Sequence, residues 1–271
     1  MGQKDLENFY ETWSSKPPSA IDYDIEALMR KADVIVAQIP ATFFQQVRSV
    51  IDVGCGYGRL LRRFQERLAT TVKVAVGVHV SGAAIQIANQ KFQRESLKYF
   101  KLPHLDITGN VDSLPSTIPD RVDCILLVDL LEHVPDCKSL VLSLAQFTRF
   151  FIVKLPVESS VFDNYLWRKE YPSSVHSNGH LREFDANNVH YFVRQLGFTP
   201  LYESLYIYHI DDTCPPLPVD CTFKQKVVRW LIRGFKGVAA HVLPKKIFLR
   251  WVGGGGYFCL ATFDPTHILN P

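Results

Sequence analysis

A turn that contains three glycines is the segment of this chain best suited to chemistry. In VIDVGCGYG, Gly54, Gly56 and Gly58 follow an apolar strand at a spacing of two, and Asp52 comes just before them. Glycines accept positive φ angles and let a ligand lie against the backbone, and the amides of the following helix would point at that ligand. A dinucleotide site would need a glycine at the position of Arg59. The turn therefore predicts a ligand site of another class.

The same turn resembles motif I of class I S-adenosylmethionine-dependent methyltransferases of the small-molecule type, which reads apolar-apolar-Asp-apolar-Gly-x-Gly-x-Gly. A second segment, LLVDLLEHVPD at 126–136, resembles the family's loop after the fourth strand, which often carries Leu-Glu-His-x-x-Asp. The resemblance covers about residues 45–210 and the last strand, and it implies S-adenosylmethionine as the cofactor. The residues that match motif I, and are implied to contact the cofactor, are Asp52, Gly54, Cys55, Gly56 and Gly58.

Two further segments supply cofactor contacts that the resemblance implies. GNVDSLP at 109–115 looks like the family's Gly-Asp-Ala-x-x-Leu-Pro segment, with Asn110 where an Asp usually receives the adenine amino group and Val111 offering a backbone amide to the ring. An Asn side chain can still accept that bond through its amide oxygen. The loop after the fourth strand adds Asp129 and Leu130.

His79 stands at the end of the second expected strand, where the family usually has an acid that binds both ribose hydroxyls. It lies 21 residues after Gly58, close to the ~20 expected for such an acid. Three interpretations stay open: His79 and the adjacent Val80 bind the ribose, ribose is bound elsewhere with lower affinity, or the cofactor site is vestigial. A charged imidazole only donates hydrogen bonds. If neutral His79 holds ribose, we expect the affinity to fall as the pH drops from about 8 to 5.5, through the ordinary histidine pKa.

Three histidines are candidates for the base that takes a proton from a methyl acceptor. Methyl transfer is an in-line displacement that needs alignment, exclusion of water and, for a hydroxyl acceptor, a base of near-neutral pKa. The candidates are His133, after the fourth strand, and His176 and His180, in the long loop after the fifth. A structural or solvated role is the alternative for each. His176 and His180 are spaced like helical metal ligands, but Asn178-Gly179 lies between them and no clear third ligand follows, so we expect no metal.

Aromatic residues and one arginine are candidate contacts for the substrate. The N-terminal NFYETW resembles the aromatic lid of many small-molecule methyltransferases, and the loop at 157–185 is rich in Tyr, Trp and His. Loops longer than about 12–15 residues in a compact domain are usually functional. Ordinary packing is the alternative. The candidates are Tyr10, Trp13, Tyr165, Trp167 and Arg182.

Alternating strand-like and helix-like segments must position these residues. Apolar strands that alternate with helices form parallel sheets covered on both faces, and ligands bind at the carboxyl ends of the strands. With the resemblance, this predicts an α/β Rossmann-like class I methyltransferase fold: a seven-stranded, mostly parallel sheet with an antiparallel last strand and helices on both faces. The expected strands are 49–54, 72–80, 104–108, 123–129, 150–157, 201–210 and 257–263.

The chain is expected to divide into four segments. The first is an N-terminal helical lid, which contains a predicted helix at 22–39, and the second is the methyltransferase core with six strands. The third is a basic amphipathic insertion on the substrate face, and the fourth is the last strand with a tail. Their expected bounds are 1–45, 46–210, 211–252 and 253–271.

The net charge of +3 is unevenly distributed along the chain. Residues 224–250 carry eight Lys or Arg and no acid, and an apolar face that includes Trp230 and Phe235. Such a helix could lie on an anionic membrane or hold a phosphorylated or lipid-linked substrate, and the alternative is a cap on the sheet with solvated lysines. Nucleic acid is not an expected partner, because the basic footprint is small and no Asn/Asp-Pro-Pro-aromatic segment follows the fourth strand.

These observations predict S-adenosylmethionine-dependent O-methylation of a small or lipid-linked acceptor, in natural-product, quinone or surface-glycan metabolism. Two alternatives stay open. One is a non-catalytic adaptor on the same fold, recruited to membranes through 224–250 and supported by His79 and Asn110; the other is an NAD-dependent oxidoreductase, against which Arg59 argues. No apolar run approaches the ~20 residues of a membrane span, and the polar N-terminus is unlike a signal peptide. We therefore expect a cytoplasmic protein, peripheral at a membrane if the basic segment binds lipid.

Overall fold

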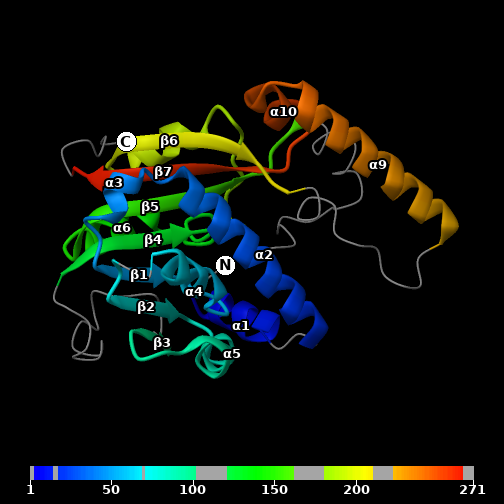
Figure 1. Cartoon of the computed structure of the whole chain (residues 1–271). Coiled ribbons are helices and arrows are strands. Elements are labelled where there is room, and N and C mark those ends of the chain that lie inside the picture. Colours follow the sequence, from blue (N-terminus) through cyan, green and yellow to red (C-terminus); the bar gives the residue numbers. More distant parts are fainter. Residues whose placement is uncertain are drawn as a thin grey trace.

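One seven-stranded sheet forms the centre of the molecule (Figure 1). The structure, a computed structural model, describes residues 3–14, 18–68, 71–101, 121–161, 180–209 and 222–264. The strand order is β3-β2-β1-β4-β5-β7-β6. The strands are β1 (Ser49–Val53), β2 (Val74–His79), β3 (Leu97–Lys101), β4 (Val122–Val128), β5 (Thr148–Val157), β6 (Phe198–Ile207) and β7 (Gly255–Phe263).

The pairing of these strands confirms the predicted mixed sheet. β1 pairs in parallel with β2 on one side and with β4 on the other, and β3 and β5 continue the parallel part. β7 runs antiparallel to both β5 and β6. The strand order reverses at β1 and β4, and such a switch point opens a crevice at the carboxyl ends of the strands.

The third strand lies earlier in the chain than the sequence predicted. It is formed by LKYFK, Leu97–Lys101, where Leu97 and Tyr99 are buried and the residues between and after them are partly or fully exposed. This strand is at the edge of the sheet, and two lysines interrupt its apolar pattern. Residues 104–108, where the strand was expected, lie outside the described residues.

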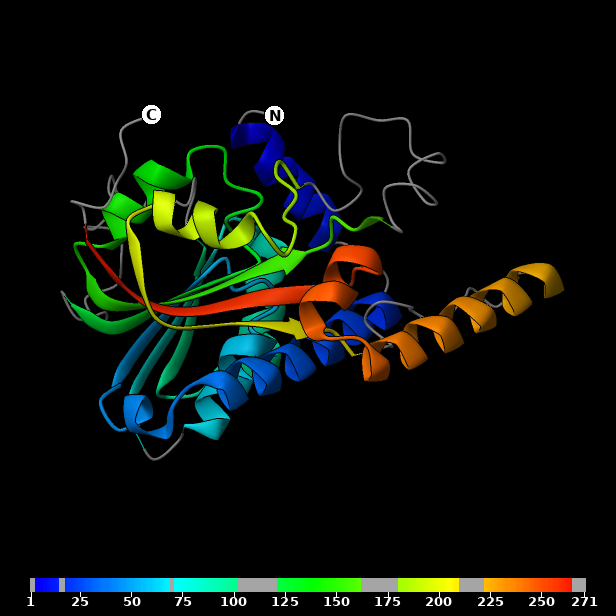
Figure 2. The ribbon, with the colours of Figure 1, turned by 90° about the horizontal axis from the view of Figure 1, so that it is seen from above.

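Helices cover both faces of the sheet, as predicted (Figure 2). Side chains of β4 alternate between them: Cys124 and Leu126 pack on the side of α2, α4 and α5, whereas Ile125 and Leu127 pack on the side of α6, α7 and α10. The helices are α1 (Gln3–Ser14), α2 (Pro18–Gln38), α3 (Ala41–Phe44), α4 (Arg59–Arg67), α5 (Gly82–Phe92), α6 (Cys137–Leu144), α7 (Val189–Gln195), α9 (Phe223–Val242) and α10 (Lys245–Trp251).

The basic segment forms two helices with different surroundings. α9 extends away from the sheet (Figure 2), and its Phe223 and Trp230 are 81% and 72% exposed. Most of α9 therefore does not cover the sheet. α10 does cover it, because its Phe248 and Leu249 are buried in the core. Within the described ranges, no helix is long and apolar enough to cross a membrane. The four segment boundaries stay a prediction.

Candidate cofactor and acceptor site

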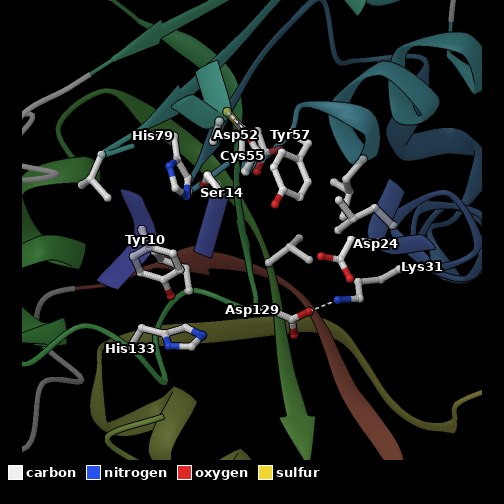
Figure 3. Close-up of a pocket in the computed structure, with 18 of the residues that line it drawn as sticks. Tyr10, Ser14, Asp24, Lys31, Asp52, Cys55, Tyr57, His79, Asp129 and His133 are labelled. Carbon is white, nitrogen blue, oxygen red and sulfur yellow. Dashed lines mark hydrogen bonds and ion pairs between the residues drawn. The ribbon is translucent and has the colours of Figure 1, made fainter. Parts of the chain in front are cut away.

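A cavity of about 330 Å³ lies where β1, β2 and β4 end (Figure 3). The glycine turn and the residues after β2 and β4 form one side of it, and α1 and α2 form the other. Of the implied cofactor contacts, eight line this cavity. They are Asp52, Gly54, Cys55, Gly56, His79, Val80, Asp129 and Leu130.

The three glycines of the turn have positive φ angles but different surroundings. A Cβ at Gly56 would meet no heavy atom within 4 Å, so its backbone faces open space in the cavity. Gly54 lies under the side chain of Leu130. Gly58 does not line the cavity: a Cβ there would lie 2.5 Å from the ring of Tyr99, whose hydroxyl donates to the Gly58 carbonyl at 2.8 Å. Gly58 therefore packs against Tyr99, and its cofactor contact stays a prediction.

Asp52 lies in β1 and is 2% exposed. Its Oδ2 is buried and has no hydrogen-bond partner in the described part of the chain. Burial raises the pKa of Asp52 to about 7, because the charged form loses water without gaining a partner. A donor from a ligand would remove this cost.

His79 is buried at the end of β2, on the wall of the cavity. The backbone amide of Ser81 donates to Nδ1 at 3.0 Å, so the neutral ring carries its proton on Nε2. Burial lowers the pKa of His79 to about 4, although Glu11 acts in the opposite direction. The pH dependence expected between 8 and 5.5 is thus wrong for this environment, since His79 stays neutral over that range. Neutral His79 can offer one N–H to a ligand.

α1 closes the cavity from the side of the N-terminus. The Tyr10 ring lies edge-on to the ring of His79 at 5.4 Å and to that of His133 at 5.7 Å. The Glu11 carboxylate accepts from the amides of Gly82 and Ala83, at the start of α5. Tyr10 therefore lines the cavity as predicted for a lid residue. The side chain of Trp13 lies outside the described residues.

Asp129 is held by two lysines at the end of β4. Its two carboxylate oxygens accept from Lys31 of α2 and Lys154 of β5, and its φ is 49°. Burial acts to raise its pKa, but Lys154 and Lys31 together hold the pKa of Asp129 well below its usual range. Lys154 is 1% exposed and also donates to the Tyr208 hydroxyl at 2.6 Å.

A second cavity of about 340 Å³ adjoins the first. The two share wall residues from α2, from the end of β4 and from the loop that carries His180. The second cavity extends toward the ends of β5 and β6. A ligand in the first cavity and a molecule in the second would therefore meet near the shared wall. The shared residues are Asp24, Ala27, Lys31, Asp129 and His180.

Two of the three candidate histidines meet at this wall. The rings of His133 and His180 are 4.7 Å apart, and His133 lines the first cavity while His180 lines both. Glu132 lines the second cavity, is 0% exposed, and neither of its oxygens has a partner among the described residues. Burial raises the pKa of Glu132 well above its ordinary value. His176 lies outside the described residues, as do four other candidates, Asn110, Val111, Tyr165 and Trp167.

Arg182 has a structural role where a substrate contact was expected. Its guanidinium donates to the carbonyls of Leu131 at 3.2 Å, Val134 at 2.5 Å and Pro135 at 2.5 Å. It is not among the described residues that line either cavity. Because these bonds use the guanidinium to hold the loop after β4, the expectation of substrate binding by Arg182 is corrected.

Four charged residues of the site were not predicted from the sequence. Glu132 was noted only as part of the Leu-Glu-His segment, and Glu11 and Lys31 lie in helices without a distinctive local pattern. Lys154 had a signal: it is the single charge in the apolar run FIVKLPV, and a buried lysine requires a partner.

The cavity fits S-adenosylmethionine on the evidence of its own walls. Gly56 leaves the backbone open to a ligand, the buried Asp52 oxygen lacks a donor, and His79 can donate from Nε2. A positively charged sulfonium and a ribose both suit a site with buried carboxylates. Sheet order and cavity together define a class I S-adenosylmethionine-dependent methyltransferase.

Comparison with known families agrees with this class. A family described as methyltransferase domain matches residues 25–203, and the chain belongs to this family. The chain is also similar to the ubiquinone biosynthesis O-methyltransferases of Psychrobacter cryohalolentis, at 31% identity, and Pseudomonas fluorescens, at 32%. Each match spans 94 residues, which is 35% of this chain and 34% or 37% of the relative. The matched part is thus about a third of these curated relatives' length.

Solved structures share the fold at low sequence identity. A chain of the complex between the Haloferax volcanii Trm112 methyltransferase activator and a methyltransferase aligns with a TM-score of 0.61 at 13% identity, covering 94% of this chain and 97% of that one. Magnesium protoporphyrin IX methyltransferase from Synechocystis aligns with a TM-score of 0.52 at 14% identity, covering 90% and 87%. These likenesses confirm the predicted Rossmann-like methyltransferase fold.

Proposed function

We propose that this protein transfers a methyl group from S-adenosylmethionine to the hydroxyl oxygen of a small acceptor. The observation that carries this proposal is the pair of adjoining cavities, one lined by the glycine turn and the other by polar groups. S-adenosylmethionine supplies an activated methyl group for in-line displacement. The chain itself has to align the acceptor, exclude water and remove a proton.

The first cavity is assigned to the cofactor. The backbone at Gly56 would lie against it, and Asp52 and neutral His79 would hold its polar groups. Tyr10 and α1 cover the same cavity and would keep water from the reacting atoms. Asn110 and Val111 stay proposed contacts of the adenine ring, on the resemblance alone.

The second cavity is assigned to the acceptor, and His133 and His180 to removal of its proton. Together with Glu132, they lie at the wall between the cavities, where the acceptor oxygen would meet the methyl group. His176, Tyr165 and Trp167 stay proposed acceptor contacts, from the long loop after β5. The similarity to ubiquinone biosynthesis O-methyltransferases supports a phenolic acceptor of quinone metabolism.

The basic helix supports an acceptor that is linked to a lipid. α9 exposes Trp230 and Phe235 together with Lys224, Lys226 and Arg233, and the segment at 224–250 has no acid. Apolar and cationic groups on one helix suit an anionic membrane surface, where each Lys or Arg contributes about 1 kcal/mol. We propose that α9 places the protein at a membrane that holds the acceptor.

Calorimetry with S-adenosylmethionine, S-adenosylhomocysteine and NAD tests the cofactor assignment. We expect both S-adenosyl compounds to bind with one-to-one stoichiometry and NAD not to bind. Absence of S-adenosylmethionine binding at millimolar concentration would favour the non-catalytic adaptor, and selective NAD binding would favour the oxidoreductase.

A methyl-transfer assay with phenolic acceptors tests the reaction. We expect methylation on oxygen by the unmodified chain, and at least a tenfold lower kcat for His133→Ala and His180→Ala with cofactor affinity kept. His241→Ala, on α9, is the matched control. If the cofactor binds but no phenol is methylated, the cofactor site is supported and the proposal of a phenolic acceptor is contradicted.

A further inference from the structure

A fully buried carboxylate lies at the wall between the two cavities. Glu132 is 0% exposed, faces the second cavity, and both of its oxygens lack a hydrogen-bond partner among the described residues. A buried carboxylate without compensation costs several kcal/mol. Its neighbour Asp129 is already neutralised by Lys31 and Lys154. No ion pair of this kind joins Glu132 to a lysine or arginine among the described residues.

Two imidazoles stand beside this carboxylate. Glu132, His133 and His180 each offer one ligand atom, and these three atoms lie within 4.8 Å of one another. His133 is 7% exposed, and so is the His180 side chain. Two nitrogens and one carboxylate oxygen form a donor set that suits zinc and related divalent ions, and such sites leave a coordination position open.

The backbone holds these ligands from two segments of the chain. The amide of Leu181 donates to the carbonyl of Glu132 at 2.8 Å, which joins the His180 segment to the loop after β4. Arg182 fixes the same loop through three carbonyls. A zinc ion bound here would need its ligand atoms at about 2.0–2.2 Å, and these backbone contacts keep the two segments that carry them together.

Glu158 lies beside one of the two imidazoles. Its Oε2 lies 3.0 Å from Nδ1 of His180, at the distance of an ion pair. If Nδ1 carries the proton and faces this carboxylate, Nε2 carries the lone pair that can bind a ligand. A carboxylate behind a histidine is the usual arrangement at metal sites, where it fixes the tautomer and orients the ring. Glu158 thus belongs with the three ligand side chains as a positioning residue.

We propose that Glu132, His133 and His180 bind a divalent transition-metal ion, with the open coordination position at the wall between the cavities. The role of this ion depends on the proposed function. An acceptor hydroxyl bound to the ion becomes more acidic, and its proton can then pass to solvent. With the ion bound, His133 and His180 act as its ligands in place of the base role proposed above, and the ion makes the acceptor oxygen nucleophilic. The prediction from the sequence that no metal binds was based only on the spacing of His176 and His180, and the present proposal replaces it.

Metal binding by the full chain, without a histidine tag, tests the site. After chelator treatment and dialysis, the protein is titrated with Zn²⁺, Mn²⁺ and Mg²⁺ by calorimetry, and Co²⁺ is added to record its visible absorption. We expect one ion per chain, tighter binding of Zn²⁺ than of Mg²⁺, and a Co²⁺ spectrum of four- or five-coordinate type. No stoichiometric binding of any of these ions would overturn the proposal.

Variants assign the bound ion to this cluster. We expect Glu132→Gln and His180→Ala to weaken Zn²⁺ binding at least a hundredfold, and Glu158→Gln to weaken it about 10–100-fold. His241→Ala, an exposed histidine on α9, should leave the affinity unchanged. Glu132→Gln keeps the shape of the side chain, and circular dichroism checks its folding. Unchanged Zn²⁺ affinity in folded Glu132→Gln and His180→Ala would overturn the proposal.

The outcome is distinguishable from a failure of the proposed function. Chelated protein that binds no added ion, yet methylates a phenol at the full rate, would overturn the metal site and leave the function standing. Protein that binds Zn²⁺ through these residues but never methylates a hydroxyl would leave the metal site standing and overturn the acceptor assignment.

Discussion

Single residues at the carboxyl ends of the strands differ in role even where their types are alike. Gly56 and Gly58 are both in the left-handed region, but one faces the cavity and the other faces the Tyr99 ring. His79 is a histidine that does not titrate near neutral pH, because it is buried and its Nδ1 already accepts from Ser81. The surroundings of each side chain, more than its type, set what it contributes.

The two glycines give a matched pair of predictions. Gly58→Ala places a methyl 2.5 Å from an aromatic ring, so we expect overpacking to cost about 1–3 kcal/mol, in addition to about 1–2 kcal/mol of backbone strain. Gly56→Ala has the same backbone strain, but its methyl group would point into open space. We therefore expect thermal melting to show a larger loss for Gly58→Ala, and calorimetry to show a larger loss of S-adenosylmethionine affinity for Gly56→Ala. The reverse order would contradict these roles.

The pKa of His79 predicts when cofactor binding responds to acid. The neutral ring donates from Nε2, and protonation would give up the bond that Nδ1 accepts from Ser81. Because burial lowers the pKa of His79 to about 4, the neutral form is kept at higher pH and lost as the pH falls through that value. Between pH about 8 and 5.5, we expect His79 to cause no change in the affinity for S-adenosylmethionine. Near pH 4 we expect protonation of His79 to lower this affinity. His79→Asn, measured over the same range by calorimetry, should lack the acid step. A step near pH 6.5 that disappears in His79→Asn would refute the buried state.

At the scale of elements, α1 is tied to α5 by one side chain. The Glu11 carboxylate accepts from Ser81 Oγ at 3.0 Å, from Gly82 N at 2.7 Å and from Ala83 N at 3.2 Å. These amides belong to the first turn of α5, where free N–H groups and the helix dipole favour a carboxylate. Burial acts to raise the pKa of Glu11, but hydrogen bonds from the two amides, Ser81 and Lys101 lower it overall. A charged carboxylate on a helix end therefore holds α1 against α5, as the proposed lid role requires.

Removal of this contact should loosen the lid. We expect Glu11→Ala to speed the release of S-adenosylhomocysteine several-fold, because Tyr10 on the same helix covers the cavity, and to lower stability by about 1 kcal/mol as loss of a cap does. Stopped-flow displacement measures the rate. Asp22→Asn, which removes an exposed ion pair between α2 and Lys91 of α5, is the control. An equal release rate in Glu11→Ala and Asp22→Asn would argue against a latch on α1.

At the scale of the whole molecule, α9 stands apart from the sheet while α10 belongs to it. The core would lose Phe248 and Leu249 if 224–250 were deleted, so deletion cannot separate membrane binding from folding. Substitutions of Trp230 and Phe235 on α9 can do so, because both side chains are exposed. This arrangement allows the membrane proposal to be tested in a folded protein.

We expect the chain to co-sediment with vesicles that contain phosphatidylglycerol and much less with neutral phosphatidylcholine vesicles. Trp230→Glu with Phe235→Glu should reduce the bound fraction at least fivefold, and salt near 1 M, where the Debye length is about 3 Å, should reduce it as well. Tyr191→Glu, at a residue 69% exposed on α7, is the control. An unchanged bound fraction in the α9 variant would remove the membrane role.

The sequence by itself determined the fold class, the cofactor class and most of the residues of the glycine turn and of the strand ends that line the first cavity. The reason is that these features are local: Asp52 and the glycines are continuous in the chain, and His79 follows at a characteristic distance along it. Strands buried on both faces were recognisable for the same reason, whereas β3 at the edge was not, because its pattern is half polar.

Only the tertiary structure decided which distant residues share the site. His180 meets Glu132 and His133 through contacts between segments about fifty residues apart, and Lys31 and Lys154 reach Asp129 from α2 and β5. Tertiary packing likewise gave Gly58 and Arg182 structural roles. Contacts of this kind depend on how helices pack on the sheet, and no local pattern of residue types contains that information.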